Sequence, residues 1–175
     1  FKVKWQEEVI AEEAQMLCLH MGGELASIEN INQQKFIENI IQTQGVSQGV
    51  ESDYFIGYIE EDVNGVYSWS DDTESDYTYW AAGEPSDPRP NNCVKLDMDQ
   101  EYKWADTVCN DTLPFVCEYT DTPCQSSDEC HEELGECYMG QCRCKPGYHG
   151  DGVEACQDIN ECYFQPCGEH GQCNT

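Results

Sequence analysis

The sequence predicts an α+β domain followed by a small disulfide-rich segment. Two stretches with helical spacing of apolar residues come first, and short aromatic, strand-like stretches separated by long loops follow them. The 13 cysteines are unevenly placed, with four in residues 1–120 and nine in residues 121–175. The first part is long enough to bury a hydrophobic core, whereas the second must be held together by disulfides.

The helices and strands are expected in that order along the first 120 residues. One helix is expected over residues 7–23 and a second over residues 27–45, because glycines end both patterns. The apolar residues spaced as for one helical face are Val9, Ala14, Met16, Leu17 and Cys18 in the first helix and Ile31, Phe36, Ile40 and Ile41 in the second. Short strands are then expected at residues 53–59, 65–70, 93–98, 103–109 and 114–119.

The composition restricts the possible partners. The net charge is −27, from 35 acidic and 8 basic residues, so the phosphates of nucleic acids and of anionic membranes would be repelled. Carboxylates favour calcium, although an acidic surface that only keeps the protein soluble has the same composition. Thirteen cysteines and the sequon Asn-Asp-Thr at Asn110 indicate a secreted protein or an ectodomain. No window approaches the roughly 20 apolar residues of a membrane span.

Seven motifs give the first part a family resemblance. "GGELASI", "FIGY", "GVYSWSD", "YWAAGEPS", "NNCVKLD", "KWADTVC" and "LPFVCEY" occur in the order and spacing of a C-type lectin-like domain, over about residues 1–119. The resemblance implies the pairs Cys18–Cys117 and Cys93–Cys109 and the short form of the domain. We therefore expect a lectin-like domain over residues 1–120, with two helices, short antiparallel strands and long loops.

Residues 121–157 resemble an epidermal-growth-factor-like (EGF-like) module. Six cysteines have its spacing, and the resemblance implies the pairs Cys124–Cys137, Cys130–Cys142 and Cys144–Cys156. Spacing alone leaves 15 pairings open. Zinc also suits closely spaced cysteines, but the secreted context and the lack of paired Cys-x2-Cys units argue against it.

Residues 158–175 resemble the opening of a calcium-binding EGF-like module. In that family the side chains of Asp158 and Glu161 and the carbonyl of Ile159 hold the ion, and hard oxygen ligands of this kind suit calcium. The segment ends after its third cysteine, so Cys162 can meet Cys173 while Cys167 lacks a partner. We expect calcium here when the whole module is present.

The loop around "EPSDPRPNNC" decides between two uses of the lectin-like domain. In sugar-binding relatives five oxygen-bearing positions bind calcium and two sugar hydroxyls together. Here Glu84 and Asp106 are kept, Ser86 and Asn91 replace an amide and a carboxylate, and Ala105 cannot ligate. The site is therefore weakened or lost. An auxiliary calcium site is expected at Glu60, Asn64, Asp87 and Asn92, with a solvated acidic loop as the alternative.

These features predict an extracellular recognition or adhesion module that binds a glycan or a protein through the long loops, with or without calcium. A structural component of an extracellular matrix or filament, self-assembling and without bound sugar, is the main alternative, and an acidic mineral-associated matrix protein is a third. The four histidines lack metal or triad spacing, and no nucleophile elbow or phosphate loop is present. We therefore predict no enzyme.

Overall fold

The computed structural model describes residues 1–45, 51–60, 65–86, 92–119, 122–138, 140–150 and 152–159, apart from the side chains of Trp5 and Gln6. It divides into two compact units. The first contains Phe1–Gln15 and Glu24–Glu118, and the second contains Met16–Gly23 and Tyr119–Thr175. Within the described part of the chain, no helix has the length and apolar character needed to cross a membrane.

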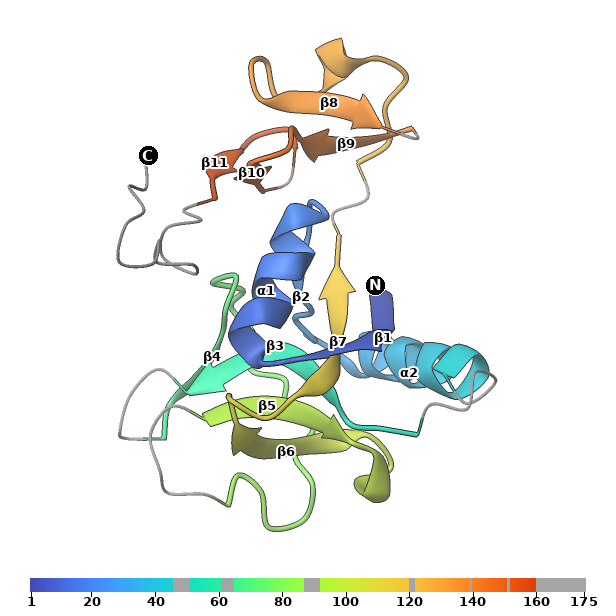
Figure 1. Cartoon of the computed structure of the whole chain (residues 1–175), viewed down its shortest axis with the longest axis vertical. Coiled ribbons are helices and arrows are strands. Elements are labelled where there is room, and N and C mark those ends of the chain that lie inside the picture. The colour runs from blue at the N-terminus through green and yellow to red at the C-terminus, as the bar shows by residue number, and fades with distance from the viewer. Residues whose placement is uncertain are drawn as a thin grey trace, which may run out of the picture. The chain divides into compact units, whose positions relative to one another are not determined.

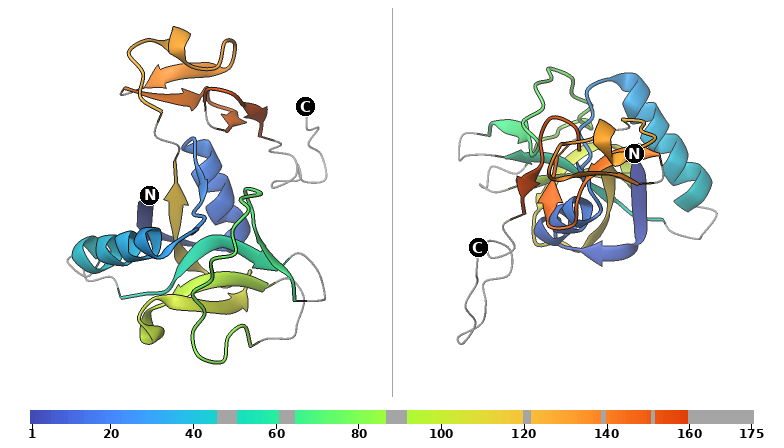
Figure 2. Two further views of the ribbon diagram at one scale, coloured as in Figure 1. Left: turned by 180° about the vertical axis from the view of Figure 1, so that it is seen from behind. Right: turned by 90° about the horizontal axis from the view of Figure 1, so that it is seen from above.

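The first unit is built on one sheet, to which seven of the described strands belong (Figures 1 and 2). The order is β1–β7–β3–β5–β6, with β2 beside β7 and β4 beside β3. The strands are β1 (Lys2–Val9), β2 (Glu24–Leu25), β3 (Tyr54–Glu60), β4 (Tyr67–Trp69), β5 (Asn92–Asp97), β6 (Lys103–Val108) and β7 (Leu113–Glu118). Neighbours are antiparallel, except that β3 and β7 pair in parallel at Phe55 and Phe115. With its two helices and short strands, this is the α+β class that the sequence predicts.

Strand β1 occupies residues where the sequence predicts the start of a helix. Val3 lies opposite Val116, and Val9 lies opposite Leu113 on β7. The first helix, α1 (Ala11–His20), begins only after this pairing ends. The placement of Val9 on a helical face was therefore wrong. Pairing with β7 gives the backbone of β1 its hydrogen-bond partners, and this overrides the local apolar spacing.

The second helix, α2 (Ile31–Ile40), begins at a capped end and continues into a π-helical turn, Ile41–Gly45. The side chain of Asn30 accepts hydrogen bonds from the backbone N–H groups of Asn32 and Gln33, at 3.0 and 3.1 Å. Such a cap gives hydrogen-bond acceptors to the first backbone N–H groups of the helix, which have none within the helix. Figure 1 shows α2 on the outer flank of the first unit, close to the N-terminus of the chain.

The buried face of α2 matches the predicted one only at its C-terminal end, where Ile40 packs against the core and Ile41 is fully buried. Gln34, Ile37 and Glu38 are buried, whereas Ile31 and Phe36 are 44% and 53% exposed. Gln34 lies inside because it joins two buried groups: Trp104 Nε1 donates to its Oε1 at 2.9 Å, and its Nε2 donates to the Tyr102 carbonyl at 3.0 Å. A buried amide with these partners occupies a position where periodicity favours an apolar residue.

Aromatic side chains dominate the core between the sheet and the loops. Trp104 is fully buried and packs edge to face with Trp69 and with the half-buried Trp80, at centroid distances of 5.4 and 5.9 Å. Tyr58 lies 4.5 Å from Trp69 and 5.4 Å from Trp104. These rings contribute much of the buried apolar area that stabilises the unit.

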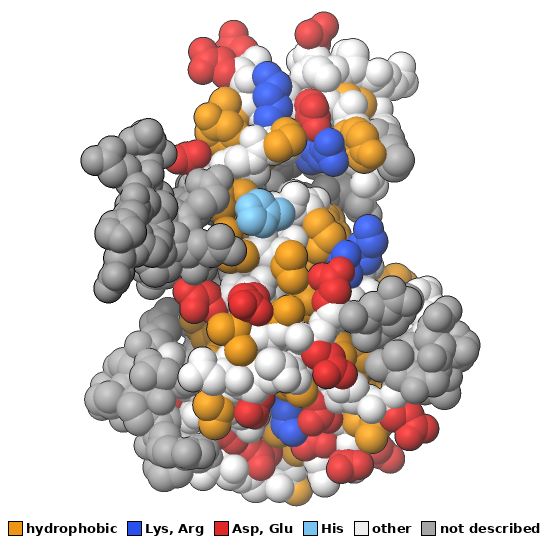
Figure 3. Space-filling model, in the orientation of Figure 1, with side chains coloured by type: hydrophobic (Ala, Val, Ile, Leu, Met, Phe, Trp, Pro, Cys, Tyr) orange, Lys and Arg blue, Asp and Glu red, His pale blue; other side chains and the backbone are white. Residues whose placement is uncertain are grey.

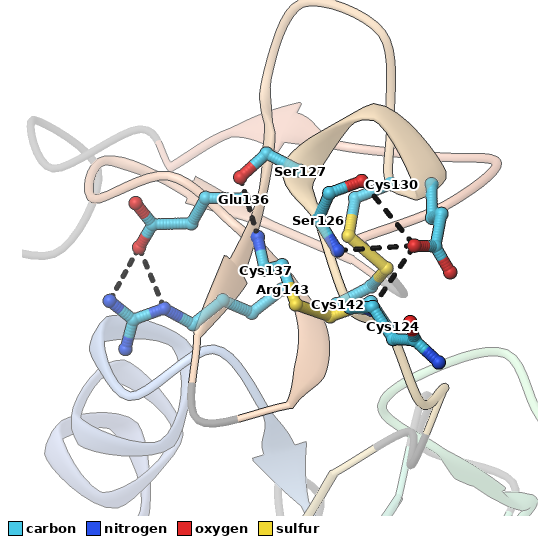
Figure 4. The surroundings of a disulfide bond; sticks show 10 residues. Cys124, Ser126, Ser127, Cys130, Glu136, Cys137, Cys142 and Arg143 are labelled. Atoms are coloured by element: carbon cyan, nitrogen blue, oxygen red, sulfur yellow. Dashed lines mark hydrogen bonds and ion pairs between the residues drawn. A yellow bond between two sulfur atoms is a disulfide. The ribbon is translucent and has the colours of Figure 1, made fainter.

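The second unit is small and cysteine-rich. Its described strands form two pairs, β8 (Gly135–Tyr138) with β9 (Gln141–Cys144), and β10 (Tyr148–His149) with β11 (Gln157–Asp158). Its described disulfides are Cys124–Cys137, Cys130–Cys142 and Cys144–Cys156, the first two of which lie beside the β8–β9 pair in Figure 4. Small sheets held by disulfides are compatible with an EGF-like module.

Candidate functional site

A loop docked on strand β6 positions the residues predicted to form the lectin site. The N–H of Ala81 donates to the Trp104 carbonyl at 2.8 Å, and the N–H of Trp104 donates to the Tyr79 carbonyl at 2.9 Å. A turn follows, in which the N–H of Glu84 donates to the Ala81 carbonyl at 3.1 Å. Glu84 is thereby brought to the part of β6 that carries Asp106.

Glu84, Ser86 and Asp106 form one hydrogen-bonded cluster. The backbone N–H of Ser86 donates to Asp106 Oδ1 at 3.0 Å, and its hydroxyl lies 3.3 Å from the same oxygen. The backbone N–H of Asp106 in turn donates to Glu84 Oε2 at 3.4 Å. The Glu84–Pro85 peptide bond is cis.

Asp106 affects the protonation of Glu84 in this cluster. A hydrogen bond between the Glu84 and Asp106 side chains, together with burial and the charge of Asp106, raises the pKa of Glu84 above its ordinary value. Two carboxylates at such short range favour a shared proton or a bound cation. The cluster therefore presents converging oxygen ligands of the kind that calcium prefers.

The remaining residues of the predicted loop site contribute less. Asn91 lies outside the described residues. Ala105 is buried, 4% exposed, opposite Lys95 in the β5–β6 pairing, and a methyl group offers no ligand. Three of the four predicted loop ligands are thus brought together, namely Glu84, Ser86 and Asp106.

Half of the predicted auxiliary site is described. Glu60 at the end of β3 and Asn92 at the start of β5 are both buried, and Asn92 Nδ2 donates to Glu60 Oε2 at 3.1 Å. Asn64 and Asp87 lie outside the described residues. The described pair links two neighbouring strands, so Glu60 already has one amide partner inside the protein.

The EGF-like calcium residues are described in part. Asp158 is exposed on β11 opposite Tyr148, and Ile159 is buried with its N–H donating to the Gly147 carbonyl at 2.9 Å. Glu161, Cys162, Cys167 and Cys173 lie outside the described residues.

Ten cysteines of the described residues are in disulfide bonds. The structure joins Cys93 to Cys109, and Cys18 and Cys117 are both fully buried and disulfide-bonded. In the second unit the sulfur atoms of Cys124, Cys130 and Cys142 lie within 4.8 Å of one another, a spacing that would suit a metal. All three are oxidised, so none offers the thiolate that zinc requires.

One acidic pair was missed by the sequence analysis. Asp71 accepts hydrogen bonds from the Ser27 hydroxyl at 2.6 Å and from the Thr73 backbone N–H at 3.0 Å. The pKa of Glu118 is raised to about 8. The largest cause is burial, and the smaller causes are a hydrogen bond to Asp71 and the charge of Asp71. Asp71 and Glu118 each lie in one of the quoted motifs, but no motif joins them, because they are far apart in the sequence and meet only through folding.

Asn110 is exposed in the turn after β6, as a glycan acceptor must be. The neighbouring Asp111 N–H donates to the Val108 carbonyl at 2.9 Å, and Thr112, the third residue of the sequon, is also exposed. We expect a glycan on Asn110 in protein secreted from eukaryotic cells. Intact mass before and after enzymatic deglycosylation should show it in the wild type and in Thr112→Ser, but not in Thr112→Ala. Secreted wild-type protein of unmodified mass would contradict this expectation.

Comparisons with known proteins agree with this fold. The sequence matches the family described as lectin C-type domain over residues 7–119. Human C-type mannose receptor 2 is 28% identical over 117 residues, which make up 67% of this chain but only 8% of the receptor. The C-type lectin domain of murine dendritic cell inhibitory receptor 2, solved in complex with N-glycan, superposes with a TM-score of 0.56 at 26% identity, over 66% of this chain and 85% of that one.

A second solved structure shows how varied such relatives are. A calcium-independent type II antifreeze protein superposes with the same TM-score, 0.56, at 25% identity, over 66% of this chain and 81% of that one. Fold similarity therefore does not decide whether calcium is used. Because the family match covers well over half of the residues, the chain belongs to the C-type lectin domain family.

Proposed function

We propose that this chain is an extracellular recognition module that binds a glycan or a protein through the loop carrying Glu84 and Ser86, with calcium held between Glu84 and Asp106. The observation that carries the proposal is that the carboxylates of Glu84 and Asp106 lie together where the loop docks on β6, with Ser86 donating to Asp106 and the Asp106 N–H donating to Glu84. The glycan-bound relative supports this class of ligand. In the second unit we propose an EGF-like spacer, with a further calcium site at Asp158, Ile159 and Glu161.

The residues present fit a calcium ion of modest affinity. Glu84 and Asp106 would hold it, and their raised tendency to share a proton is what a divalent cation relieves. Bound calcium would accept lone pairs from ligand oxygens, such as adjacent sugar hydroxyls. Glu84 and Asp106 would then accept hydrogen bonds from these hydroxyl groups, and Ser86 would donate or accept one further hydrogen bond. With two carboxylates, we expect a dissociation constant of about 1 mM or weaker, at the weak end of extracellular calcium modules.

Calcium titration of matched variants tests the metal part of the proposal. Glu84→Gln and Asp106→Asn each remove one of the two charges with little change in shape, so the heat of binding assigned to this site should disappear or its affinity should fall at least roughly tenfold. Asp99→Asn removes the same charge from an exposed turn and serves as the control. If Asp99→Asn changed calcium binding as much as the other two, the ion would not be bound at the Glu84–Asp106 cluster.

A glycan array read with calcium and with chelator tests the ligand part. We expect binding that chelation and Asp106→Asn both remove, while Asp99→Asn leaves it intact. Glycan binding that survived chelation, Glu84→Gln and Asp106→Asn would show a calcium-independent site elsewhere on the domain.

A structural role in a matrix or filament is the second candidate, and Ala105 favours it. The buried methyl group removes both a calcium ligand and an amide donor from β6. Ser86 already donates to Asp106 within the chain, so the loop is internally satisfied without a ligand. Absence of both calcium binding and glycan binding would leave this candidate as the better account of the domain.

A further inference from the structure

Two disulfides of the second unit lie side by side in a cluster of four cysteines (Figure 4). The bonds Cys124–Cys137 and Cys130–Cys142 both join residues 124–130 to the β8–β9 pair. The sulfur atoms of Cys124, Cys130 and Cys142 all lie within 4.8 Å of one another, although Cys124 is bonded to neither of the other two. We call these residues the four-cysteine cluster.

The backbone of the unit accommodates a second pairing of the same four cysteines. Cys137 and Cys142 lie directly opposite each other in the antiparallel pairing of β8 with β9. Residues in such positions have Cα atoms about 4.5–5.5 Å apart, and a disulfide spans about 4.4–6.8 Å between Cα atoms. Cys124 and Cys130 already have neighbouring sulfur atoms. A bond from Cys137 to Cys142 and another from Cys124 to Cys130 are therefore within reach while the strands stay paired.

A hollow in the surface gives small molecules access to Cys130. Its volume is about 650 Å³, and Cys130 forms part of its wall. The charged side chains that line it are those of Asp128, Glu132, Glu136 and Lys145, so acids outnumber bases. The wider surface has the same sign, because Figure 3 shows many more Asp and Glu than Lys and Arg side chains on the face in view. The approach of a thiol to Cys130 is therefore favoured by a positive charge and opposed by a negative one.

We infer that the four-cysteine cluster is a thiol–disulfide exchange site, whose substrate is an external thiol that carries no negative charge beyond its thiolate. The thiolate attacks Cys130 Sγ, and the Cys130–Cys142 bond breaks to give a mixed disulfide and a Cys142 thiolate. Cys142 then attacks Cys137 Sγ, which forms the Cys137–Cys142 bond and releases a Cys124 thiolate. Finally Cys124 attacks Cys130 Sγ, which forms the Cys124–Cys130 bond and returns the external thiolate. The pairing changes without net oxidation or reduction.

The exchange changes which parts of the second unit are covalently joined. In the pairing that the structure shows, both bonds tie residues 124–130 to the strands β8 and β9. After exchange, one bond closes within residues 124–130 and the other closes within the strand pair. Noncovalent contacts, such as the 2.9 Å hydrogen bond from the Cys124 N–H to the Gly140 carbonyl, then hold the segment to the strands. The segment that follows the lectin-like domain is thereby released from its covalent link to the β8–β9 pair.

Disulfide mapping of the full chain after exposure to a low concentration of cysteamine tests this inference. The reaction is stopped with acid, and the protein is cleaved between neighbouring cysteines without reduction and analysed by mass spectrometry. We expect peptides that join Cys137 to Cys142 and Cys124 to Cys130, with no gain of free thiol. The bond Cys144–Cys156 should open at least roughly tenfold more slowly, because neither of its cysteines lines the hollow. A sample without cysteamine corrects for exchange started by the chain itself, whose 13 cysteines are an odd number.

The charge of the thiol makes the test specific. Cysteamine is cationic, 2-mercaptoethanol is neutral and 2-mercaptoethanesulfonate is anionic, and their rates are compared per thiolate. The rate should fall in that order, over a range of at least roughly tenfold at low salt that narrows as salt is added. Glu132→Gln should narrow the range by about twofold, because it removes a charge beside Cys130. Glu154→Gln, at an exposed acid that does not line the hollow, should leave the range unchanged.

Three outcomes would overturn the inference. The first is a protein whose original pairs persist at every cysteamine concentration that leaves Cys144–Cys156 closed. The second is the opening of all three disulfides of the unit at one rate, because this indicates unfolding of the unit. The third is an equal effect of Glu132→Gln and Glu154→Gln on the order of the three thiols, because the charge preference would then come from the whole protein.

Discussion

Glu118→Gln should stabilise the domain at neutral pH and flatten its dependence on pH. The carboxyl of Glu118 has an ordinary pKa of 4.5 when the chain is unfolded, and burial beside Asp71 raises the pKa to about 8 in the folded state. Between these values the folded chain keeps a proton that the unfolded chain releases. The free energy of unfolding therefore falls as the pH rises from about 4.5 to about 8, and it levels off above that range.

The substitution removes this titration and preserves the hydrogen bond. The amide of Gln can donate to Asp71 at any pH, whereas the acid donates only while it is protonated. The gain should be near zero at pH 4 and should grow to about 3 kcal/mol at pH 8, after allowance for the partial exposure of Glu118 and its coupling to Asp71.

Chemical denaturation at a series of pH values measures this gain in the free energy of unfolding. Chelator is present so that no divalent cation compensates the charges of Glu118 and Asp71. Glu74→Gln, an exposed acid in the same loop as Asp71, should leave the pH profile of the wild type unchanged. A wild-type profile that stayed flat between pH 5 and 8 would show that the Glu118–Asp71 pair does not hold a proton.

Gln34→Leu should destabilise the domain by about 3–5 kcal/mol, although it places an apolar side chain in the core. The substitution leaves the buried Trp104 Nε1–H without its acceptor and the Tyr102 carbonyl without its donor. It also removes the 3.0 Å hydrogen bond from Gln34 to Glu38. Each stranded buried group costs about 1–3 kcal/mol.

Thermal and urea unfolding measure this loss, with Gln100→Leu at an exposed position as the control, expected within about 0.5 kcal/mol of the wild type. Because the Trp104 carbonyl anchors the loop through Ala81, the calcium binding that we propose at Glu84 and Asp106 should weaken in Gln34→Leu as well. A variant as stable as the wild type would mean that leucine packing compensates for the lost hydrogen bonds.

Sequence reasoning succeeded where information is local or carried by motifs. Helical periodicity, aromatic strand segments and the split of the cysteines were enough for the α+β class and a disulfide-rich second part. Glu84, Ser86 and Asp106 were named from the motifs that resemble the family, and the structure brings them together. Sequence spacing alone cannot show that residues from two separate segments form one site. The grouping of Glu84 and Ser86 with Asp106 therefore depended on the resemblance to the C-type lectin-like domain.

The failures concern residues whose surroundings come from distant parts of the chain. The inward position of Gln34 depends on Trp104 and Tyr102, which lie far along the sequence, so periodicity placed Ile31 and Phe36 with the apolar face instead. Val9 belongs to a strand because β7 lies beside it. Glu118 directly follows a cysteine at the end of a motif, and only folding reveals that its neighbour is another acid.

The cluster of three tryptophans provides an intrinsic spectroscopic probe of the domain. Trp69, Trp80 and Trp104 lie with ring centroids 5.4 and 5.9 Å apart in edge-to-face pairs, a range at which their electronic transitions couple. Trp80 lies in the loop that leads to Glu84 and contacts Trp104 through a backbone bridge. Movement of that loop therefore changes the coupling, so near-ultraviolet circular dichroism and tryptophan emission should report on the loop that carries Glu84 without any added label.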